Sequence, residues 1–305
     1  ILWYCTRARD YPEIFGQQIT PEEYQEHTGM QLSPLWVAAK IAWLRDNKPD
    51  IFEKTAWFAN GQEYFLYLLG AENWETDPAS LTLNGMMDIR KLDWSDRVLE
   101  MCGISRDRVP PVGPPSGMVG KVSKQASEAT GIPEGVILCR GAGDQQCAAI
   151  GAGVIRQGMA EFTVGTAGVM VAHLDSVDRI KGKNLWWGGH GVPGAWDIEG
   201  GAFCLGASLK WWRDNLGLDE VQEAESRNTS PYAVMVDKAQ ESPAGARGLL
   251  FHSFLASQVT PYYDADSRGG LIGLGNYHTR VDLVRALLEG CAHEMKMVVD
   301  AFQSD

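Results

Sequence analysis

The sequence predicts an α/β protein built from two domains. Two segments in the middle of the chain support this prediction. In residues 136–153, a short apolar run leads through Gly141-Ala142-Gly143-Asp144 into a helix of small residues, and the order strand, glycine turn, helix is typical of α/β ligand sites. Residues 159–172 contain two apolar segments joined by a glycine-bounded turn, which predicts a β-hairpin. We place the domain boundary near residue 154 or 155, so residues 1–154 and 155–305 form the two domains.

The N-terminal part is predicted to be largely helical. Ser33-Pro34 is a favourable helix start, and a helix is expected from there to a stop near Lys48-Pro49. Asn60-Gly61 opens a second helix that ends at Gly70. The remaining expectations are a loop or strand over residues 77–88, a short helix after Asp93-Trp94-Ser95, a rigid proline-rich connection over residues 110–115 and a buried strand over residues 136–139.

The C-terminal part contains the clearest single element. Apolar side chains from Val284 to Phe302 recur on one face, which predicts a helix over residues 281–302. Residues 208–216 are predicted to be helical, and residues 248–251 to form another buried strand.

Composition excludes some functions. The 305 residues carry a net charge of −12, which does not favour binding to nucleic acid or to an anionic membrane. No apolar run is long enough to span a bilayer, and no signal peptide is evident. The six cysteines form no CxxC pair and show no metal-ligand spacing with histidine, so we expect free thiols in a reducing cytoplasm and no metal site built from them.

Asp144 is the first candidate functional residue. It follows a predicted strand end, and Gly141 and Gly143 would let a ligand approach its carboxylate. One interpretation is a general base that accepts a hydroxyl proton while the oxygen attacks phosphorus. The alternative is a helix N-cap, a role that aspartate fills well before an alanine-rich helix.

Two glycine-containing segments are candidates for binding a nucleotide. The backbone N–H groups of the turn Gly165-Thr166-Ala167-Gly168 could form an anion site, although a plain hairpin turn has the same sequence. Gly206 would allow close approach to a helix start, and Lys210 lies one turn later on the same face. The alternative for that segment is an ordinary helix start with a solvated lysine.

The order and spacing of these segments resemble the FGGY family of carbohydrate kinases, which includes glycerol kinase and xylulokinase. The resemblance rests first on Gly141-Ala142-Gly143-Asp144-Gln145-Gln146 and on residues 161–168. It extends through nearly the whole chain, at Leu2-Trp3 with Arg7-Ala8, Thr76-Asp77, Leu92-Asp93-Trp94, residues 199–216, Thr260 to Asp264, Arg268-Gly269, Gly273-Leu274, Arg285-Ala286 and Leu288-Glu289-Gly290.

The resemblance implies an actin-like fold, with two α/β domains of ribonuclease-H type, and an ATP- and Mg²⁺-dependent kinase acting on a small sugar or polyol. It assigns Asp144 as catalytic base and Gln145 to the substrate hydroxyls. Gly165 and Thr166 would meet the ATP phosphates, and Gly206 and Lys210 would contact the nucleotide. It implies a cytoplasmic enzyme and is compatible with a homodimer.

Three departures from the family pattern leave the substrate open. Cys5 stands where the family usually has aspartate. Leu35 stands where glycerol kinases place a substrate-binding tyrosine, which counts against glycerol. Ser257-Gln258-Val259 replaces the Gly-Glu-Arg common in xylulokinases. A pentulose-type sugar, another polyol and glycerol remain candidates, as does a degenerate member that binds sugar without catalysis.

Both ends of the sequence resemble cuts through a longer protein. The chain opens on Ile1 without an initiator methionine and closes on Asp305 directly after a long helix. The family's first phosphate-binding hairpin, with an aspartate that helps to hold magnesium, would precede Ile1, and its adenosine-binding segment would follow Asp305. We therefore expect little or no kinase activity from residues 1–305 alone.

Overall fold

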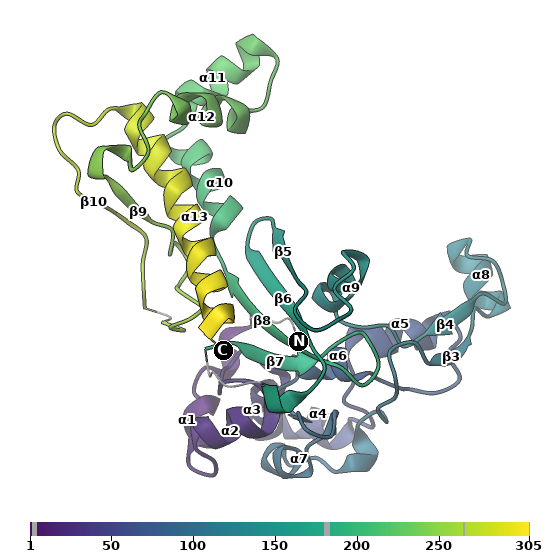
Figure 1. Ribbon diagram of the computed structural model, residues 1–305. Helices are drawn as coiled ribbons and strands as arrows, with labels where there is room; N and C mark the ends of the chain where they lie inside the picture. The colour runs from purple at the N-terminus through teal and green to yellow at the C-terminus, as the bar shows by residue number, and fades with distance from the viewer. Residues whose placement is uncertain (2–4, 180–183, 265, 305) are drawn as a thin grey trace. The chain divides into compact units, whose positions relative to one another are not determined.

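A computed structural model of the chain describes residues 1, 5–179, 184–264 and 266–304. Their contacts divide into two compact units (Figure 1). Unit 1 comprises residues 1–161 and 171–198, and unit 2 comprises residues 162–170 and 199–305. The Leu2-Trp3 part of the family-like N-terminal segment lies outside the described residues. The boundary near residues 154–155 stays a prediction, since the change from one unit to the other falls within strands β5, β6 and β8.

Unit 1 is mainly helical. Its helices are α1 (Tyr11–Gly16), α2 (Pro21–Thr28), α3 (Val37–Asn47), α4 (Pro49–Lys54), α5 (Gly61–Leu69), α6 (Pro78–Thr82), α7 (Asp96–Cys102), α8 (Lys124–Thr130) and α9 (Asp144–Gly151), with 3-10 turns at Thr6–Ala8, Arg106–Arg108 and Val177–Arg179. Its short strands are β1 (Met87–Asp88), β2 (Asp93–Trp94), β3 (Met118–Lys121), β4 (Ile137–Cys139) and β7 (Trp186–Gly189).

Unit 2 combines long helices with short strands. It contains α10 (Leu205–Asn215), α11 (Leu218–Arg227), α12 (Pro231–Gln240), a 3-10 turn at Ala246–Gly248, β9 (Leu250–His252), β10 (Gly270–Ile272) and α13 (Arg280–Ser304). The strands β5 (Ala160–Val164), β6 (Gly168–Leu174) and β8 (Trp196–Ala202) have residues in both units.

The strands form four sheets in the described part of the chain. The largest has four strands in the order β5-β6-β8-β7, and β1-β2, β3-β4 and β9-β10 are two-stranded antiparallel ribbons. The β9-β10 register places Phe251 opposite Leu271.

Local sequence signals explain several helix ends in unit 1. Thr20 and Glu23 form a capping box at the start of α2, with the Glu23 N–H donating to the Thr20 hydroxyl oxygen at 3.1 Å. The predicted helix at Asn60-Gly61 is confirmed as α5 and ends at Gly70. Gly70 has φ +118°, and a Cβ there would lie 2.6 Å from the Lys121 carbonyl oxygen, so this helix end requires glycine.

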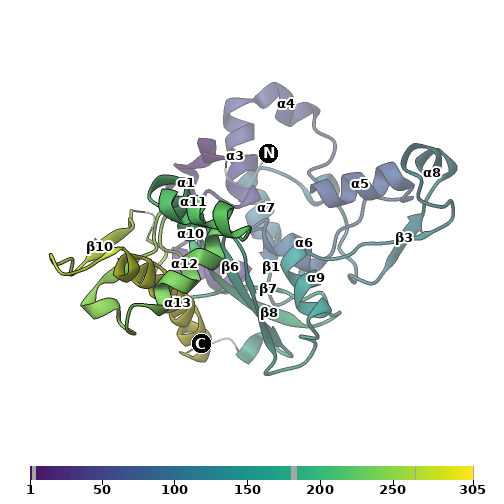
Figure 2. The ribbon, with the colours of Figure 1, turned by 90° about the horizontal axis from the view of Figure 1, so that it is seen from above.

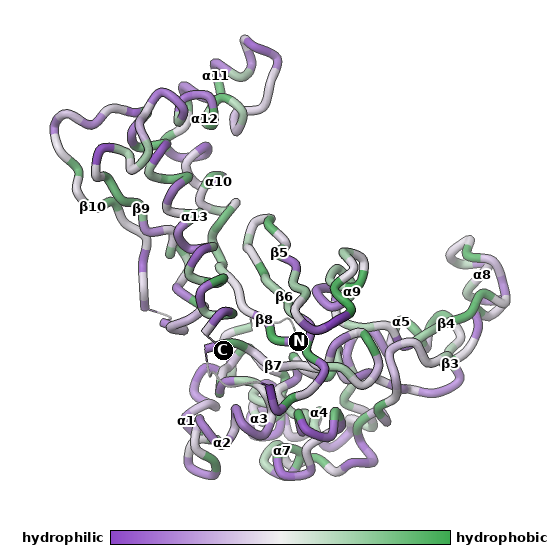
Figure 3. Tube along the Cα trace, in the orientation of Figure 1, coloured by the Kyte–Doolittle hydropathy of each residue, from purple (hydrophilic) through white to green (hydrophobic). Residues whose placement is uncertain are grey.

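The core of unit 2 forms around α13. Figure 2 shows α10 and α12 beside this helix, and Figure 3 shows hydrophobic and hydrophilic residues alternating along it. Val284, Leu287 and Val298 on α13 are fully buried, as the predicted apolar face requires. The expectation of a helix over residues 281–302 is therefore confirmed, with bounds Arg280–Ser304.

Other predicted elements differ in detail. The helix expected from Ser33-Pro34 begins at Val37. The loop or strand expected over residues 77–88 contains helix α6, whose N-cap is Asp77, and ends in strand β1. The short helix after Asp93-Trp94-Ser95 is confirmed as α7, with Ser95 as its N-cap. The β-hairpin is confirmed as β5 and β6.

The prediction of a buried strand over residues 136–139 is wrong as to burial. The strand exists as β4, but Ile137 is 59% exposed and only Leu138 of its three residues is buried. β4 pairs with β3 alone in the described structure, so its other edge is unpaired, and Ile137 and Cys139 on the face opposite Leu138 are exposed. No helix among the described residues is long and apolar enough to cross a membrane.

Candidate active site

The loop that leads to Asp144 is fixed by hydrogen bonds to two segments of unit 1, residues 115–117 and helix α5. The Gly141 N–H donates to the Pro115 carbonyl oxygen at 2.9 Å, and the Arg140 N–H donates to that of Gly117 at 3.1 Å. Gln62 on α5 donates through its side-chain amide to the Arg140 carbonyl oxygen and, at 3.0 Å, to Asp77. Gly141 has φ +85°, which favours glycine at this position. The loop is therefore held in one place at the start of α9.

Asp144 is the first residue of α9, and the N-cap is Gly143. The alternative in which Asp144 caps the helix is therefore not the observed arrangement. The Asp144 side chain is exposed, and its Oδ1 accepts a hydrogen bond from the Gln145 N–H at 2.9 Å. No ion pair with Asp144 is found among the described residues. A carboxylate with this exposure can accept a proton from a hydroxyl placed next to it.

Gln145, the predicted partner of Asp144 at the substrate, is half-buried. Its side-chain Oε1 is buried and has no hydrogen-bond partner among the described residues. A buried acceptor without a partner is uncommon and costs free energy, so it favours the presence of a donor that is not part of the chain. A sugar hydroxyl is such a donor.

Gln146 and Asp197 form a buried pair behind Asp144 that the sequence analysis did not identify. The Gln146 Nε2 donates to Asp197 Oδ2 at 2.9 Å, and both side chains are buried. Burial raises the pKa of the Asp197 carboxyl to about 7, although the hydrogen bond from Gln146 opposes this rise. The pair ties α9 to strand β8, and the 51 residues between the two partners explain why no local pattern reveals it.

The turn between β7 and β8 packs against the same helix. A Cβ added to Gly191 would lie 2.6 Å from Ile150 Cδ1 on α9 and 3.4 Å from Ala142 Cβ. A larger residue in the turn would have to displace the end of the Ile150 side chain, so the contact favours glycine there. Helix α9 and the loop before it are thus contacted from two sides within unit 1.

The glycine turn predicted to bind phosphate lies in unit 2 beside the start of α10. The Gly206 N–H donates to the Gly165 carbonyl oxygen at 3.0 Å, and the Ala207 N–H donates to the Thr166 carbonyl oxygen at 3.0 Å. A Cβ on Gly206 would lie 2.5 Å from the Gly165 carbonyl oxygen. The structure therefore brings Gly165, Thr166 and Gly206 together.

The turn keeps unused hydrogen-bond donors. Gly165 and Thr166 are exposed, and no hydrogen bond from the backbone N–H groups of Thr166 and Ala167 is found among the described residues. Two neighbouring N–H groups and a hydroxyl in a turn are suited to bind an anion such as a phosphate. The N–H groups of Gly206 and Ala207 at the start of α10 already donate to the turn, so an anion would bind to the N–H groups of the turn and not to those of the helix.

Lys210 lies on α10 one turn after Gly206, as predicted from the sequence. Its Nζ pairs with Asp214 Oδ2 at 3.1 Å, and its side chain is 63% exposed. Asp214 lies one helical turn after Lys210, on the side away from the hairpin turn at Gly165. The lysine ammonium therefore points along α10 toward Asp214. A nucleotide would have to compete with this exposed ion pair, which is a weak interaction.

Cys5 and Leu35, the two departures from the family pattern in the first part of the chain, lie in unit 1. The Arg7 guanidinium donates to Cys5 Sγ at 3.1 Å, and this hydrogen bond lowers the pKa of the thiol. The Leu35 carbonyl oxygen accepts from Lys40 Nζ at 2.5 Å. Leu35 offers no side-chain hydrogen-bond donor or acceptor to a substrate.

No group of three or more His, Cys, Asp or Glu side chains gathers as a metal site within the described residues. Mg²⁺ commonly keeps several waters and binds through one or two carboxylates and the phosphates of its nucleotide.

Comparison with protein families matches both parts of the chain. The N-terminal domain of the FGGY family of carbohydrate kinases matches residues 1–151, and the C-terminal domain of the same family matches residues 160–305. The chain is 29% identical over 309 residues to a xylulose kinase of Bacillus subtilis, covering 99% of this chain and 58% of that protein. It is 30% identical over 313 residues to a glycerol kinase of Shewanella oneidensis, covering 100% and 60%.

Solved structures share the fold. A ligand-bound xylulose kinase from Lactobacillus acidophilus matches with a TM-score of 0.86 at 22% identity, over 99% of this chain and 59% of that one. Plasmodium falciparum glycerol kinase with ADP matches with a TM-score of 0.85 at 23% identity, over 100% and 59%. The predicted actin-like α/β fold is confirmed. The chain spans about three fifths of the length of these proteins.

Proposed function

Because the chain belongs to the FGGY family of carbohydrate kinases, we propose that the protein transfers the γ-phosphoryl group of ATP to a hydroxyl of a small sugar or polyol. The observation that supports this most is Asp144, an exposed carboxylate at the end of a fixed loop with no cation paired to it among the described residues. Phosphoryl transfer needs a positioned base for the attacking hydroxyl and donors for the phosphate charge.

In the proposed reaction, Asp144 accepts the proton of the substrate hydroxyl as its oxygen attacks the γ-phosphorus. Gln145 Oε1 accepts a hydrogen bond from a second substrate hydroxyl and so orients the sugar. The bond from the γ-phosphorus to the bridging oxygen breaks, and ADP leaves with that oxygen. Magnesium, when bound with ATP, supplies positive charge that offsets the charge on the phosphates.

Residues 155–305 supply the nucleotide-binding part in this proposal, and residues 1–154 supply the base. Gly165 and Thr166 bind ATP phosphates through the turn, where the Thr166 and Ala167 N–H groups are unused in the described structure. Gly206 keeps the start of α10 against the turn, and Lys210 contributes a cation on the nucleotide side after it leaves Asp214.

The substrate we propose is a xylulose-like pentulose or a related polyol. Relatives of similar identity include a xylulose kinase and a gluconokinase of Bacillus subtilis. Leu35 disfavours glycerol, because an aliphatic side chain offers no hydrogen bond to a small triol. Glycerol phosphorylation, or sugar binding without catalysis, is the alternative. We place the enzyme in the cytoplasm, and a homodimer stays a prediction.

Substitution of the base tests this function. In the full-length gene product, Asp144→Asn should lower kcat for sugar phosphorylation by about 10²–10⁴-fold, because the amide cannot accept the proton. The dissociation constant for ADP, measured by calorimetry, should stay within a factor of about two, since Asp144 is not assigned to the nucleotide. Glu128→Gln, which removes an exposed carboxylate on α8 in the same unit, is the matched control and should leave kcat unchanged.

A full rate in Asp144→Asn would eliminate Asp144 as the base. Sugar binding without turnover in the unsubstituted protein would instead favour the non-catalytic alternative.

A further inference from the structure

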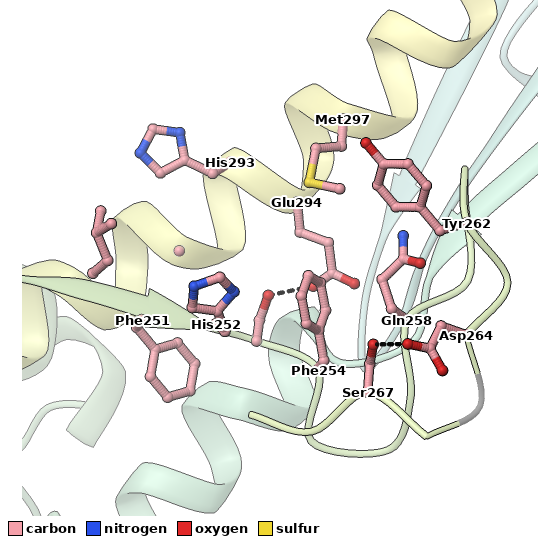
Figure 4. Close-up of a pocket in the computed structure, with 13 residues that line it drawn as sticks. Phe251, His252, Phe254, Gln258, Tyr262, Asp264, Ser267, His293, Glu294 and Met297 are labelled. Carbon is pink, nitrogen blue, oxygen red and sulfur yellow. Dashed lines mark hydrogen bonds between the residues drawn. The ribbon is translucent and has the colours of Figure 1, made fainter. Parts of the chain in front are cut away.

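A cavity lies entirely within unit 2 and is lined by none of the residues assigned to ATP. It has a volume of about 530 Å³ and lies between β9, α13 and the loop around Gln258 (Figure 4). Pockets of about 300–1,000 Å³ are typical of small-molecule sites. None of its lining residues is a lysine or arginine.

The floor of this cavity carries a buried carboxyl group. Glu294 on α13 is 2% exposed, and the Ser253 hydroxyl donates to its Oε2. Burial raises the pKa of this carboxyl, although the hydrogen bond from Ser253 opposes the rise, and no lysine or arginine lines the cavity beside it. Figure 4 shows Glu294 extending from α13 toward the interior of the cavity.

Gln258 presents a second acceptor to the same cavity. Its Nε2 donates to the Thr260 carbonyl oxygen at 2.7 Å, which fixes the orientation of the amide. The amide oxygen Oε1 is consequently directed elsewhere, and it is buried without a hydrogen-bond partner among the described residues. Since Gln258 is 4% exposed and lines the cavity, a ligand that donates a hydrogen bond would satisfy it.

The walls of the cavity are apolar and aromatic. Phe251, Phe254 and Met297 line it, and the His252 and Phe254 rings contact edge to face with centroids 5.6 Å apart. Aromatic faces attract cations as well as apolar groups. At the rim, Asp264 adds a further carboxylate, whose pKa is lowered by a hydrogen bond from Ser267.

We propose that this cavity binds a small organic ammonium compound that has an apolar body. The ammonium group would donate hydrogen bonds to Glu294 and to Gln258 Oε1, and the apolar body would pack against Phe251, Phe254 and Met297. A cation suits a site that has a buried carboxyl and no lysine or arginine in its lining, whereas an anion would meet the carboxyl groups of Glu294 and Asp264. The proposal does not depend on the kinase reaction.

Calorimetric titration with phenethylammonium, against its neutral isostere phenethyl alcohol, tests this inference in the protein without nucleotide or sugar. We expect saturable binding of the amine with one site per chain, and at least tenfold weaker binding of the alcohol. Glu294→Gln should weaken amine binding at least tenfold. Asp300→Asn removes an exposed carboxylate from the same helix and should leave the affinity unchanged.

A second variant covers the case in which Glu294→Gln fails to fold. Met297→Trp fills the cavity while keeping its charge, and it should abolish binding of the amine. Equal binding of amine and alcohol, no binding of either, or unchanged amine binding by Met297→Trp would each overturn the proposal.

Discussion

At the scale of single residues, the position of Asp144 depends on a buried neighbour that the sequence does not reveal. Gly141 and Gly143, between a strand end and Asp144, predict an open site at Asp144, and the structure shows the side chain exposed at the first residue of α9. The Gln146–Asp197 hydrogen bond behind it joins residues far apart in sequence. Local sequence patterns predict exposed residues and turns. A hydrogen bond between polar side chains far apart in the sequence can be recognised only once the fold is known.

The burial of Asp197 predicts a dependence of stability on pH. Its folded pKa of about 7 lies above its ordinary value of 3.8, so its contribution to stability is complete below pH 3.8 and is lost as the pH rises through 7. Asp197→Asn does not titrate and should be more stable than the unsubstituted protein at pH 8, by about 4 kcal/mol. At pH 5 the two proteins should differ much less.

Urea denaturation at pH 5 and pH 8 measures this difference. Glu134→Gln, an exposed carboxylate in a loop of unit 1, is the control and should show no pH-dependent gain. Equal stability of Asp197→Asn and the unsubstituted protein at both pH values would mean that Asp197 is not held in the buried state described.

At the scale of elements, patterns that repeat over many residues were the most predictable. Apolar residues recur on one face of α13 over its whole length, and a glycine turn joins β5 to β6. Both elements can therefore be predicted from the sequence. Helix α6 has five residues, too few to show a period, and it was missed. The apolar composition of β4 indicates a strand but not the neighbours that would bury it.

The contact between the hairpin turn at Gly165 and the start of α10 predicts the effect of a substitution at Gly206. Gly206→Ala places a Cβ 2.5 Å from the Gly165 carbonyl oxygen, which must force the turn and the helix apart. We expect a loss of about 1–3 kcal/mol in stability and weaker ADP binding by calorimetry. Gly270→Ala on β10, where a Cβ would meet no atom within 4 Å, is the control and should change neither quantity appreciably.

Retention of full ADP affinity by Gly206→Ala, together with its expected loss of stability, would show that this turn does not bind the nucleotide. A variant with unchanged stability would show that the described contact is absent in solution.

At the scale of the whole molecule, the sequence motifs predict the family and the fold but not the substrate. The motifs around Asp144 and Gly165 predict an FGGY kinase, and both family domains match the chain. The substrate could not be predicted, because the side chains that select it come from several segments, and Leu35 and Gln258 differ from the patterns of the named subfamilies. The amine-binding cavity could not be predicted either, since β9, α13 and the Gln258 loop meet only in the folded unit.

The most direct test of the central claim is the rate of ADP release by the full-length gene product, measured with Mg-ATP and each of xylulose, gluconate and glycerol. We expect release that depends on one of the sugars or polyols, with glycerol the weakest, and that falls to the background rate in Asp144→Asn. ADP release that is absent with every substrate while ATP still binds, or release that is the same in Asp144→Asn, would contradict the claim.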